Sequence, residues 1–367
     1  MEEFKWYTLP LPMLPTRVWR TYQGGAMIDA WRGAQGAQDG HTPEDWIAST
    51  VPAVNVGREV ENEGLSRVDG AALGLSESPL LAELVAAYPQ QMLGKWQVEK
   101  FGERPAILVK ALDAAERLSI QVHPTREDAE LHFGSPFGKT EAWYVLDTRP
   151  GEEAYVLLGF RENMTRAKWR RLFEKQDIAG MQEALHRFPV KKGDVFLVPG
   201  GVPHAIGPGC FMIEIQEPTD YTLRPERTSP SGVPLSDELC HRGLGFEGML
   251  SLFEYKFSKR EKVLERFYRE HDEGAYHGSS SLYTLIGEES TDRFRMDGVV
   301  LHDEHAFKPT GYFRIVIVQS GEGELTTSEG GRLPLKQGDT LFFPAGMSTV
   351  KAVGQGMKMI ICRPPRV

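Results

Sequence analysis

The chain has 367 residues, enough for about two domains of ordinary size, and a formal net charge of −9. That negative charge argues against non-specific binding to nucleic acid. No run of residues approaches the ~20 apolar residues of a membrane span, and the acidic, proline-broken start does not read as a signal peptide. Three scattered cysteines predict reduced thiols in a cytoplasmic protein.

The first half of the chain alternates turns with short regular elements. Helical spacing of apolar residues predicts a helix over 79–88. Residues 106–112 form an apolar run that predicts a buried strand, interrupted only by Lys110. A single lysine in such a run most often extends its charged end to the surface. The alternative is that Lys110 faces a cavity.

Polar side chains alternate with apolar ones in the segment RLSIQVHP, where Ser119, Gln121 and His123 share one face of a predicted strand. A second segment, GKTEAWYVL, places Lys139 and Glu141 on one face in the same way. Both segments otherwise look buried, and buried polar groups need partners. A divalent metal ion would supply one.

Residues 163–188 change character and predict a small helical insert. Apolar spacing fits two short helices, with Thr165 and Asp177 as their N-caps. Strands are expected to resume at 195–198 and at 211–216.

An internal repeat gives the clearest evidence of domain organisation. Residues 192–201 and 337–346 share a Gly-Asp turn, a buried strand and a Pro-x-Gly ending. Two related β-barrels explain this repeat most simply. Extending the alignment places His204 opposite Thr349, so the second barrel lacks this ligand-type residue. A purely structural role is expected for that barrel.

His204 is the third candidate ligand. A lone histidine in a turn is more often a surface or capping group, but the barrel places His204 opposite the strand that carries Gln121 and His123. Together with Glu141, the two histidines suit a borderline divalent ion. The same set also occurs in non-haem Fe(II) oxygenases. Gln121 as a fourth ligand would fill an open position, which favours zinc.

The motifs resemble the cupin superfamily and, within it, the short bacterial form of the type I mannose-6-phosphate isomerases. The resemblance covers roughly residues 105–225. It rests on Leu112-Asp113-Ala114, Leu118 to Pro124, Gly138 to Tyr144, Val198 to Gly207, Glu214-Ile215-Gln216 and Thr219 to Arg224, with a weaker match at Glu44 to Ser49.

This resemblance, together with the internal repeat, predicts a mainly β fold of two cupin-type barrels, a bicupin; the resemblance alone does not assign the C-terminal barrel. The catalytic domain would span 1–250 with the helical insert at about 161–188, and a metal-free cupin-like domain would span 251–367. The implied reaction interconverts mannose 6-phosphate and fructose 6-phosphate through an enediol. Alternatives are a related or unphosphorylated sugar, the Fe(II) oxygenase, and a non-catalytic sugar-binding cupin. The sequence predicts no particular oligomeric state.

The resemblance also implies one zinc ion per chain and assigns roles to ten residues. The zinc ligands are Gln121, His123, Glu141 and His204. The catalytic residues are Lys139, Glu214 and Arg224, and the substrate-binding residues are Ser119, Lys110 and Asp220. The general base is either Lys139 or Glu214.

The sequence departs from the family pattern in two places. The usual Trp-Gly-Gly appears here only as Trp19 and Gly24-Gly25, separated by four residues. Arg224 is followed by Pro225-Glu226-Arg227 in place of an aromatic-Asp segment. Glu217 and Glu226 would repel a phosphate dianion if they faced the cavity.

Overall fold

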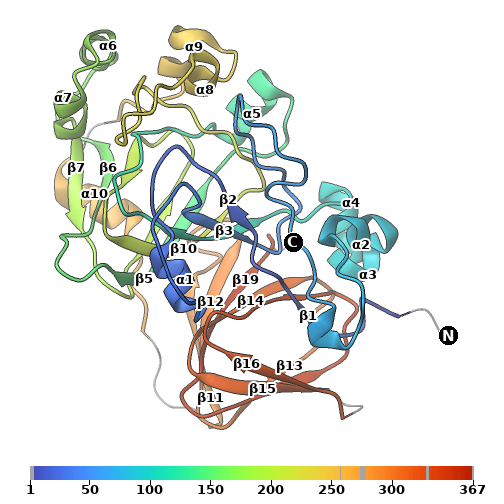
Figure 1. Ribbon diagram of the computed structural model, residues 1–367. Helices are drawn as coiled ribbons and strands as arrows, with labels where there is room; N and C mark the ends of the chain where they lie inside the picture. The colour runs from blue at the N-terminus through green and yellow to red at the C-terminus, as the bar shows by residue number, and fades with distance from the viewer. Residues whose placement is uncertain (1–3, 257, 273–277, 328–329, 366–367) are drawn as a thin grey trace.

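Strands predominate in the computed structural model, which confirms the predicted mainly β class (Figure 1). It describes residues 4–256, 258–272, 278–327 and 330–365. Within these ranges, no helix is both long and apolar enough to cross a membrane. All three cysteines are buried, and none forms a disulfide.

Two facing sheets form the upper part of Figure 1. The larger sheet runs in the order β2 (Arg17–Val18), β3 (Glu44–Ile47), β4 (Leu108–Asp113), β10 (Cys210–Gln216), β5 (Glu141–Thr148) and β8 (Val195–Val198). The smaller consists of β7 (Leu185–Pro189), β6 (Tyr155–Phe160) and β9 (His204–Ile206). Apolar side chains from both sheets, including Val145, Met212 and Val156, fill the space between them. We call this pair of sheets the first barrel.

A second pair of sheets, in orange and red, forms the lower part of Figure 1. The larger runs β1 (Leu11–Pro12), β17 (Thr340–Phe343), β14 (Arg314–Ser320), β19 (Lys358–Arg363), β12 (Arg295–Leu301) and β11 (Ser280–Ile286). The smaller runs β13 (Glu304–Phe307), β18 (Val350–Val353), β15 (Glu322–Thr327) and β16 (Arg332–Lys336). We call this pair the second barrel.

A shared apolar core joins the two barrels, because their six-stranded sheets pack against each other. Val109 and Tyr144 from the first barrel lie in one cluster with Ile315 and Ile360 from the second. The chain also crosses between the barrels: β1 pairs with β17 at the edge of the second, although it begins the chain.

Helices lie around the first barrel and at its junction with the second, where the carbonyls of Gln91 and Met92 accept the N–H groups of Gly346 and Ala345. They are α1 (Ala26–Trp31), α2 (Leu81–Ala87), α3 (Pro89–Leu93), α4 (Lys95–Phe101), α5 (Arg126–Phe133), α6 (Arg166–Lys175), α7 (Ile178–Glu183), α8 (Asp237–His241), α9 (Gly245–Ser251) and α10 (Arg260–Phe267), with a 3-10 turn at Ala71–Leu73. Helices α6 and α7 lie where the apolar spacing predicted two helices. Thr165 and Asp177 cap them, each accepting a backbone N–H, but the residues after α7 form β7 instead of a longer helix.

The repeated segments have the same local structure. Gly193 and Gly338 have φ angles of 92° and 89°, in the region that favours glycine. The next residue in each repeat, Asp194 or Asp339, accepts the backbone N–H three residues earlier at 2.8 Å. The strands that follow, β8 and β17, pair with β5 and β14. These matching turns make positions in the two barrels directly comparable.

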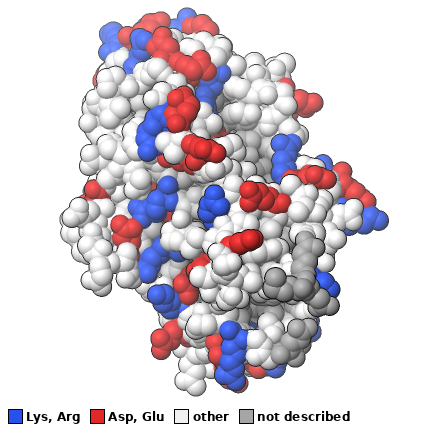
Figure 2. All heavy atoms as spheres, turned by 45° about the vertical axis from the view of Figure 1, so that its right-hand side comes forward, with Lys and Arg blue, Asp and Glu red and all other residues white. Residues whose placement is uncertain are grey.

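Acidic and basic side chains are interspersed on the face shown in Figure 2, around the middle of the molecule as well as at its upper end. The chain has several exposed ion pairs, such as Arg170 with Glu247 and Arg227 with Asp237. Exposed pairs of this kind contribute little to stability.

Candidate active site

The segment that carries Gln121 and His123 is extended, but it is not the continuous strand that the alternation predicted. It makes only two isolated bridges, from Gln121 to His204 and from Val122 to Leu223. The predicted sidedness nevertheless holds, because an extended chain alternates its side chains even where few neighbours pair with it. Ile120 and Val122 pack into an apolar cluster, so the polar residues that alternate with them face the other way.

His123, Glu141 and His204 come together as a buried cluster at one end of the first barrel. One ligand atom from each lies within 4.8 Å of the others. The Nε2 atoms of His123 and His204 lie 3.1 and 3.2 Å from the two carboxylate oxygens of Glu141. Backbone hydrogen bonds of 2.9 and 3.0 Å between Gln121 and His204 hold the two ligand-bearing segments side by side.

Hydrogen bonds fix both imidazole rings in the form that binds metals. Nδ1 of His123 lies 2.8 Å from the carbonyl of Tyr221, and Nδ1 of His204 lies 2.8 Å from the carbonyl of Val202. Because a carbonyl only accepts, each Nδ1 must carry a proton, which makes Nε2 the ring nitrogen that faces Glu141 and is available to a metal ion. Burial and the Lys139 ammonium lower the pKa of His123 to about 3, so the ring is neutral near pH 7.

The donor set of this cluster fits a divalent cation. Among the described residues, no hydrogen-bond partner of suitable geometry meets either oxygen of Glu141 or Nε2 of His204, although all three atoms are buried. The Lys139 ammonium lies 3.1 Å from Glu141 and 2.9 Å from Nε2 of His123, so the cluster already attracts one positive charge. Two imidazoles and a carboxylate match the preference of zinc and similar ions.

A polar cavity opens beside the cluster and brings together most of the residues singled out in the sequence. It is lined by Ser119, Gln121, Lys139, Lys110, Glu214, Asp220 and Arg224, and also by Arg20, Thr21, Tyr22, Glu44, Leu112, Leu118 and Thr222. Gln121 is 8% exposed and contributes to this wall.

Lys110 does not extend to the surface, so that interpretation of the sequence was wrong. The residue is 3% exposed, and its ammonium lies 3.0 Å from Glu214 and 3.8 Å from Glu44. Trp143 holds the other oxygen of Glu214 with an N–H···O bond of 3.3 Å. Burial raises the pKa of Glu214, and the nearby Glu141 carboxylate adds to the shift.

Glu44 and Arg20 are site residues that the sequence reasoning missed. Glu44 accepts hydrogen bonds from Tyr22 at 2.9 Å and from Trp46 at 2.7 Å, and it pairs with Arg20 at 3.1 Å. Arg20 also lies 3.4 Å from Asp220 and over the Trp46 ring. The departure of this segment from the family pattern could have pointed to them. Three of the four residues between Trp19 and Gly24-Gly25 line the cavity.

We expect Glu44 to stabilise the fold in a pH-dependent way. Burial opposes its ionisation, but Arg20 and Lys110 lower its pKa from 4.5 to about 2. A lowered carboxyl pKa stabilises the folded state above the unfolded-state pKa, and this stabilisation is lost as the pH falls through the folded-state pKa. Glu44→Gln should therefore reduce the free energy of unfolding by on the order of 3 kcal/mol at pH 7.

Denaturant unfolding at several pH values measures this effect. The difference between the parent and Glu44→Gln should shrink as the pH is lowered from 7 toward 3. Glu324→Gln is the matched control, because Glu324 pairs with the exposed Arg332 and should change stability by less than about 1 kcal/mol. A difference for Glu44→Gln that is constant over this range would contradict the assignment.

Arg224 also lines the cavity, and among the described residues it forms no ion pair with a carboxylate. Its guanidinium donates only long hydrogen bonds, of 3.4 and 3.3 Å, to the carbonyls of Thr222 and Leu239. Burial and the nearby Arg242 lower its pKa to about 10, so it keeps its charge at pH 7. An arginine in this state is suited to receive an anionic group.

The two carboxylates that could have repelled an anion face elsewhere. Glu226 forms two hydrogen bonds, of 2.7 and 2.8 Å, with Arg117 and accepts the Ile120 N–H. Glu217 pairs with Arg126 at 2.5 Å. Neither lines the cavity. Arg227, three residues after Arg224 in the chain, pairs with Asp237 at the surface and does not line the cavity either.

The fold and this site define a β-barrel protein with a candidate metal centre beside a charged cavity. Residues 68–166 match the family model for the catalytic domain of type I phosphomannose isomerase. Mannose-6-phosphate isomerase ManA of Bacillus subtilis is 30% identical over 256 residues, which are 69% of this chain and 73% of ManA. The chain therefore belongs to the type I phosphomannose isomerases, a family of aldose–ketose isomerases, which confirms the resemblance seen in the sequence.

Solved structures show that the fold is shared over nearly the whole chain. The crystal structure of mannose 6-phosphate isomerase from Bacillus subtilis matches with a TM-score of 0.73 and 24% identity, covering 96% of this chain and 99% of that one. A mannose 6-phosphate isomerase bound with zinc and yttrium matches with a TM-score of 0.71 and 17% identity, covering 97% and 100%.

Proposed function

We propose that this protein is a zinc-dependent isomerase that interconverts mannose 6-phosphate and fructose 6-phosphate through an enediol. The observation that carries the proposal is the buried His123–Glu141–His204 cluster beside a cavity that contains Arg224, an arginine that pairs with no carboxylate among the described residues. We also propose that the two barrels are cupin domains, divided near residue 250. The buried thiols accord with a cytoplasmic location.

One zinc ion would be held by His123, Glu141, His204 and the amide oxygen of Gln121. When bound, zinc supplies Lewis-acid stabilisation of the negative charge that develops on sugar oxygens during isomerisation. The backbone bonds from Nδ1 of each histidine orient the ring for this purpose.

The chemistry also needs a proton to leave one sugar carbon and return to its neighbour. Lys139 and Glu214 are the candidates, because both line the cavity and are buried. Lys110 and Trp143 hold the Glu214 carboxylate from two sides, which fixes its direction. Its raised pKa brings it nearer to the value that suits a general acid or base.

The phosphate group would be received by Arg224, with Ser119 beside it. The ion pairs along the cavity wall favour this role, since Arg20 pairs with Glu44 and Asp220, Lys110 pairs with Glu44 and Glu214, and Arg224 lies outside these pairs. Arg224 is thereby left to bind the substrate dianion through its planar fork of donors.

Comparing kcat/KM for mannose 6-phosphate with that for free mannose tests the proposal. We expect the phosphorylated sugar to be preferred by about a hundredfold or more, which corresponds to charge-assisted hydrogen bonds. Arg224→Lys should lower kcat/KM for mannose 6-phosphate much more than kcat/KM for free mannose, and so remove much of this preference. Equal values for the two sugars would reject phosphate recognition. Oxygen uptake without isomerisation would instead favour an Fe(II) oxygenase.

A further inference from the structure

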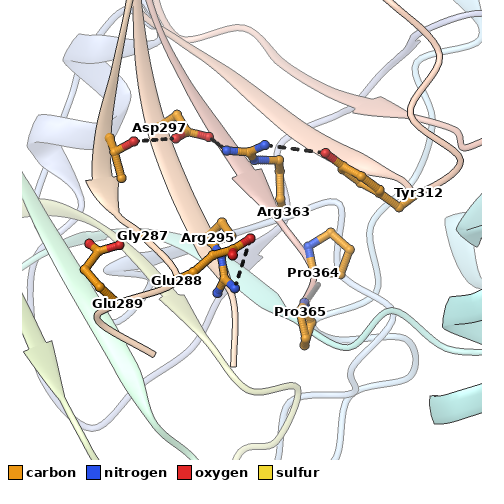
Figure 3. A pocket seen from close by; sticks show the side chains of 10 residues that line it. Gly287, Glu288, Glu289, Arg295, Asp297, Tyr312, Arg363, Pro364 and Pro365 are labelled. Atoms are coloured by element: carbon orange, nitrogen blue, oxygen red, sulfur yellow. Dashed lines mark hydrogen bonds and ion pairs between the residues drawn. The ribbon is translucent and has the colours of Figure 1, made fainter. Parts of the chain in front are cut away.

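A second cavity lies in the second barrel, between β11, β12 and β19 (Figure 3). It has a volume of about 330 Å³ and is lined by Thr284, Gly287, Glu288, Glu289, Arg295, Asp297, Tyr312, Arg363, Pro364 and Pro365. In Figure 3, Arg363 lies between Asp297 and Tyr312, while Arg295 lies beside Glu288. None of these residues belongs to the active site described above.

The repeat shows that this cavity adjoins the counterpart of the metal centre. In the first barrel, Glu141 lies opposite Val198 on the neighbouring strand. In the second barrel, Arg314 lies opposite Phe343. Val198 and Phe343 hold the same position in the repeated segments, so Arg314 takes the place of the metal-site carboxylate.

A second charge is reversed in the same comparison. On the adjacent strands β4 and β10, Lys110 lies directly opposite Glu214, which is two residues before the end of β10. On the adjacent strands β12 and β19, Asp297 lies directly opposite Ile361, which is two residues before the end of β19. Asp297 therefore takes the place of Lys110. The second barrel keeps a charged site at this end, but with the signs of the two positions exchanged.

Arginines also lie directly opposite each other here. Arg295 and Arg363 are cross-strand partners on β12 and β19, and like charges in direct opposition destabilise a sheet. Arg314, 6% exposed, stands next to them on β14, and both its burial and Arg363 lower its pKa to about 10. An anion among these side chains would remove the repulsion.

The carboxylates present satisfy only part of these donors. Asp297 pairs with Arg363, and Glu288, which is largely exposed, lies 3.6 Å from Arg295. Arg295 otherwise donates to two backbone carbonyls, and Arg314 stacks on two phenylalanine rings. Among the described residues, Nε of each of the three arginines is buried and makes no hydrogen bond.

We propose that the second barrel binds a small oxyanion, a phosphate or carboxylate group, between Arg295 and Arg363. Arginine forks recognise both groups through paired hydrogen bonds. The cluster offers neither histidine nor thiolate, and its buried carboxylate is already paired, so it does not suit a metal ion. The second barrel is then a ligand-binding unit in addition to a packing partner.

Titration calorimetry of the full chain with inorganic phosphate, and separately with acetate, tests this proposal. The parent should bind at least one of these two anions at one site per chain, in addition to any binding in the active site. Arg295→Gln should weaken the affinity of that site about tenfold or more. Turnover of mannose 6-phosphate should stay within about twofold. The anion whose binding is lost identifies the group that the site takes.

Two further variants separate this site from other causes. Arg332→Gln changes an exposed arginine of the same barrel, and it should bind the anion with the same affinity as the parent. Arg295→Lys keeps the charge but not the fork, and it should weaken binding even if Arg295→Gln fails to fold. Identical binding of both anions by the parent and both Arg295 variants would overturn the proposal, as would complete loss of binding of both anions in Arg224→Met.

Discussion

Replacing His204 with alanine is expected to remove the metal ion and nearly all isomerase activity. The substitution takes away one of two imidazoles from a buried three-residue cluster. The backbone bonds between His204 and Gln121 do not involve the ring, so the strand pairing should survive. Loss of Lewis-acid stabilisation, worth several kcal/mol, predicts a fall in kcat/KM of ~10³-fold or more.

Metal analysis and turnover should change together in this variant. The parent should contain one equivalent of zinc and His204→Ala close to none. His186→Ala is the matched control, since His186 is a buried histidine of the same barrel that bonds to the Ser258 carbonyl and does not line the cavity. Full zinc content in His204→Ala, or equal losses in both variants, would contradict the assigned ligands.

Replacing Lys139 with methionine is expected to slow turnover while leaving the metal in place. The Lys139 side chain lines the cavity, and its ammonium lies 3.1 Å from Glu141, one of the proposed metal ligands. Methionine keeps the apolar stem but cannot transfer a proton. Loss of a general acid–base group typically lowers the rate by ~10²–10⁴-fold.

Steady-state kinetics with parallel metal analysis checks this expectation. Lys192→Met serves as the control, because Lys192 belongs to the same barrel but is exposed and pairs with Asp147. It should change turnover by less than about twofold. Activity of Lys139→Met within a few-fold of the parent would show that Lys139 is not a proton-transfer group and would move that role to Glu214.

Period-two alternation and the internal repeat predicted much of this site from the sequence. Both signals depend on backbone geometry alone, which is why they placed His123, Glu141 and His204 correctly. The alternation did not reveal that the Gln121 segment lacks continuous strand partners, because side-chain sidedness is the same with or without a full ladder.

Contacts that depend on tertiary packing were not predictable in the same way. Arg20 and Asp220 are 200 residues apart in the chain, and no local pattern links them. Lys110 looked like a surface lysine because its buried partners, Glu44 and Glu214, come from other strands. The arginine pair of the second barrel is likewise visible only once β12 and β19 are in register.

The most direct test of the account follows conversion of mannose 6-phosphate to fructose 6-phosphate while zinc is returned to chelator-treated protein. We predict negligible conversion without metal and a linear recovery that saturates at one zinc ion per chain. Recovery should be absent in His204→Ala under the same conditions. Full activity of the metal-free parent, or saturation only at two zinc ions, would contradict a single catalytic zinc at His123, Glu141 and His204.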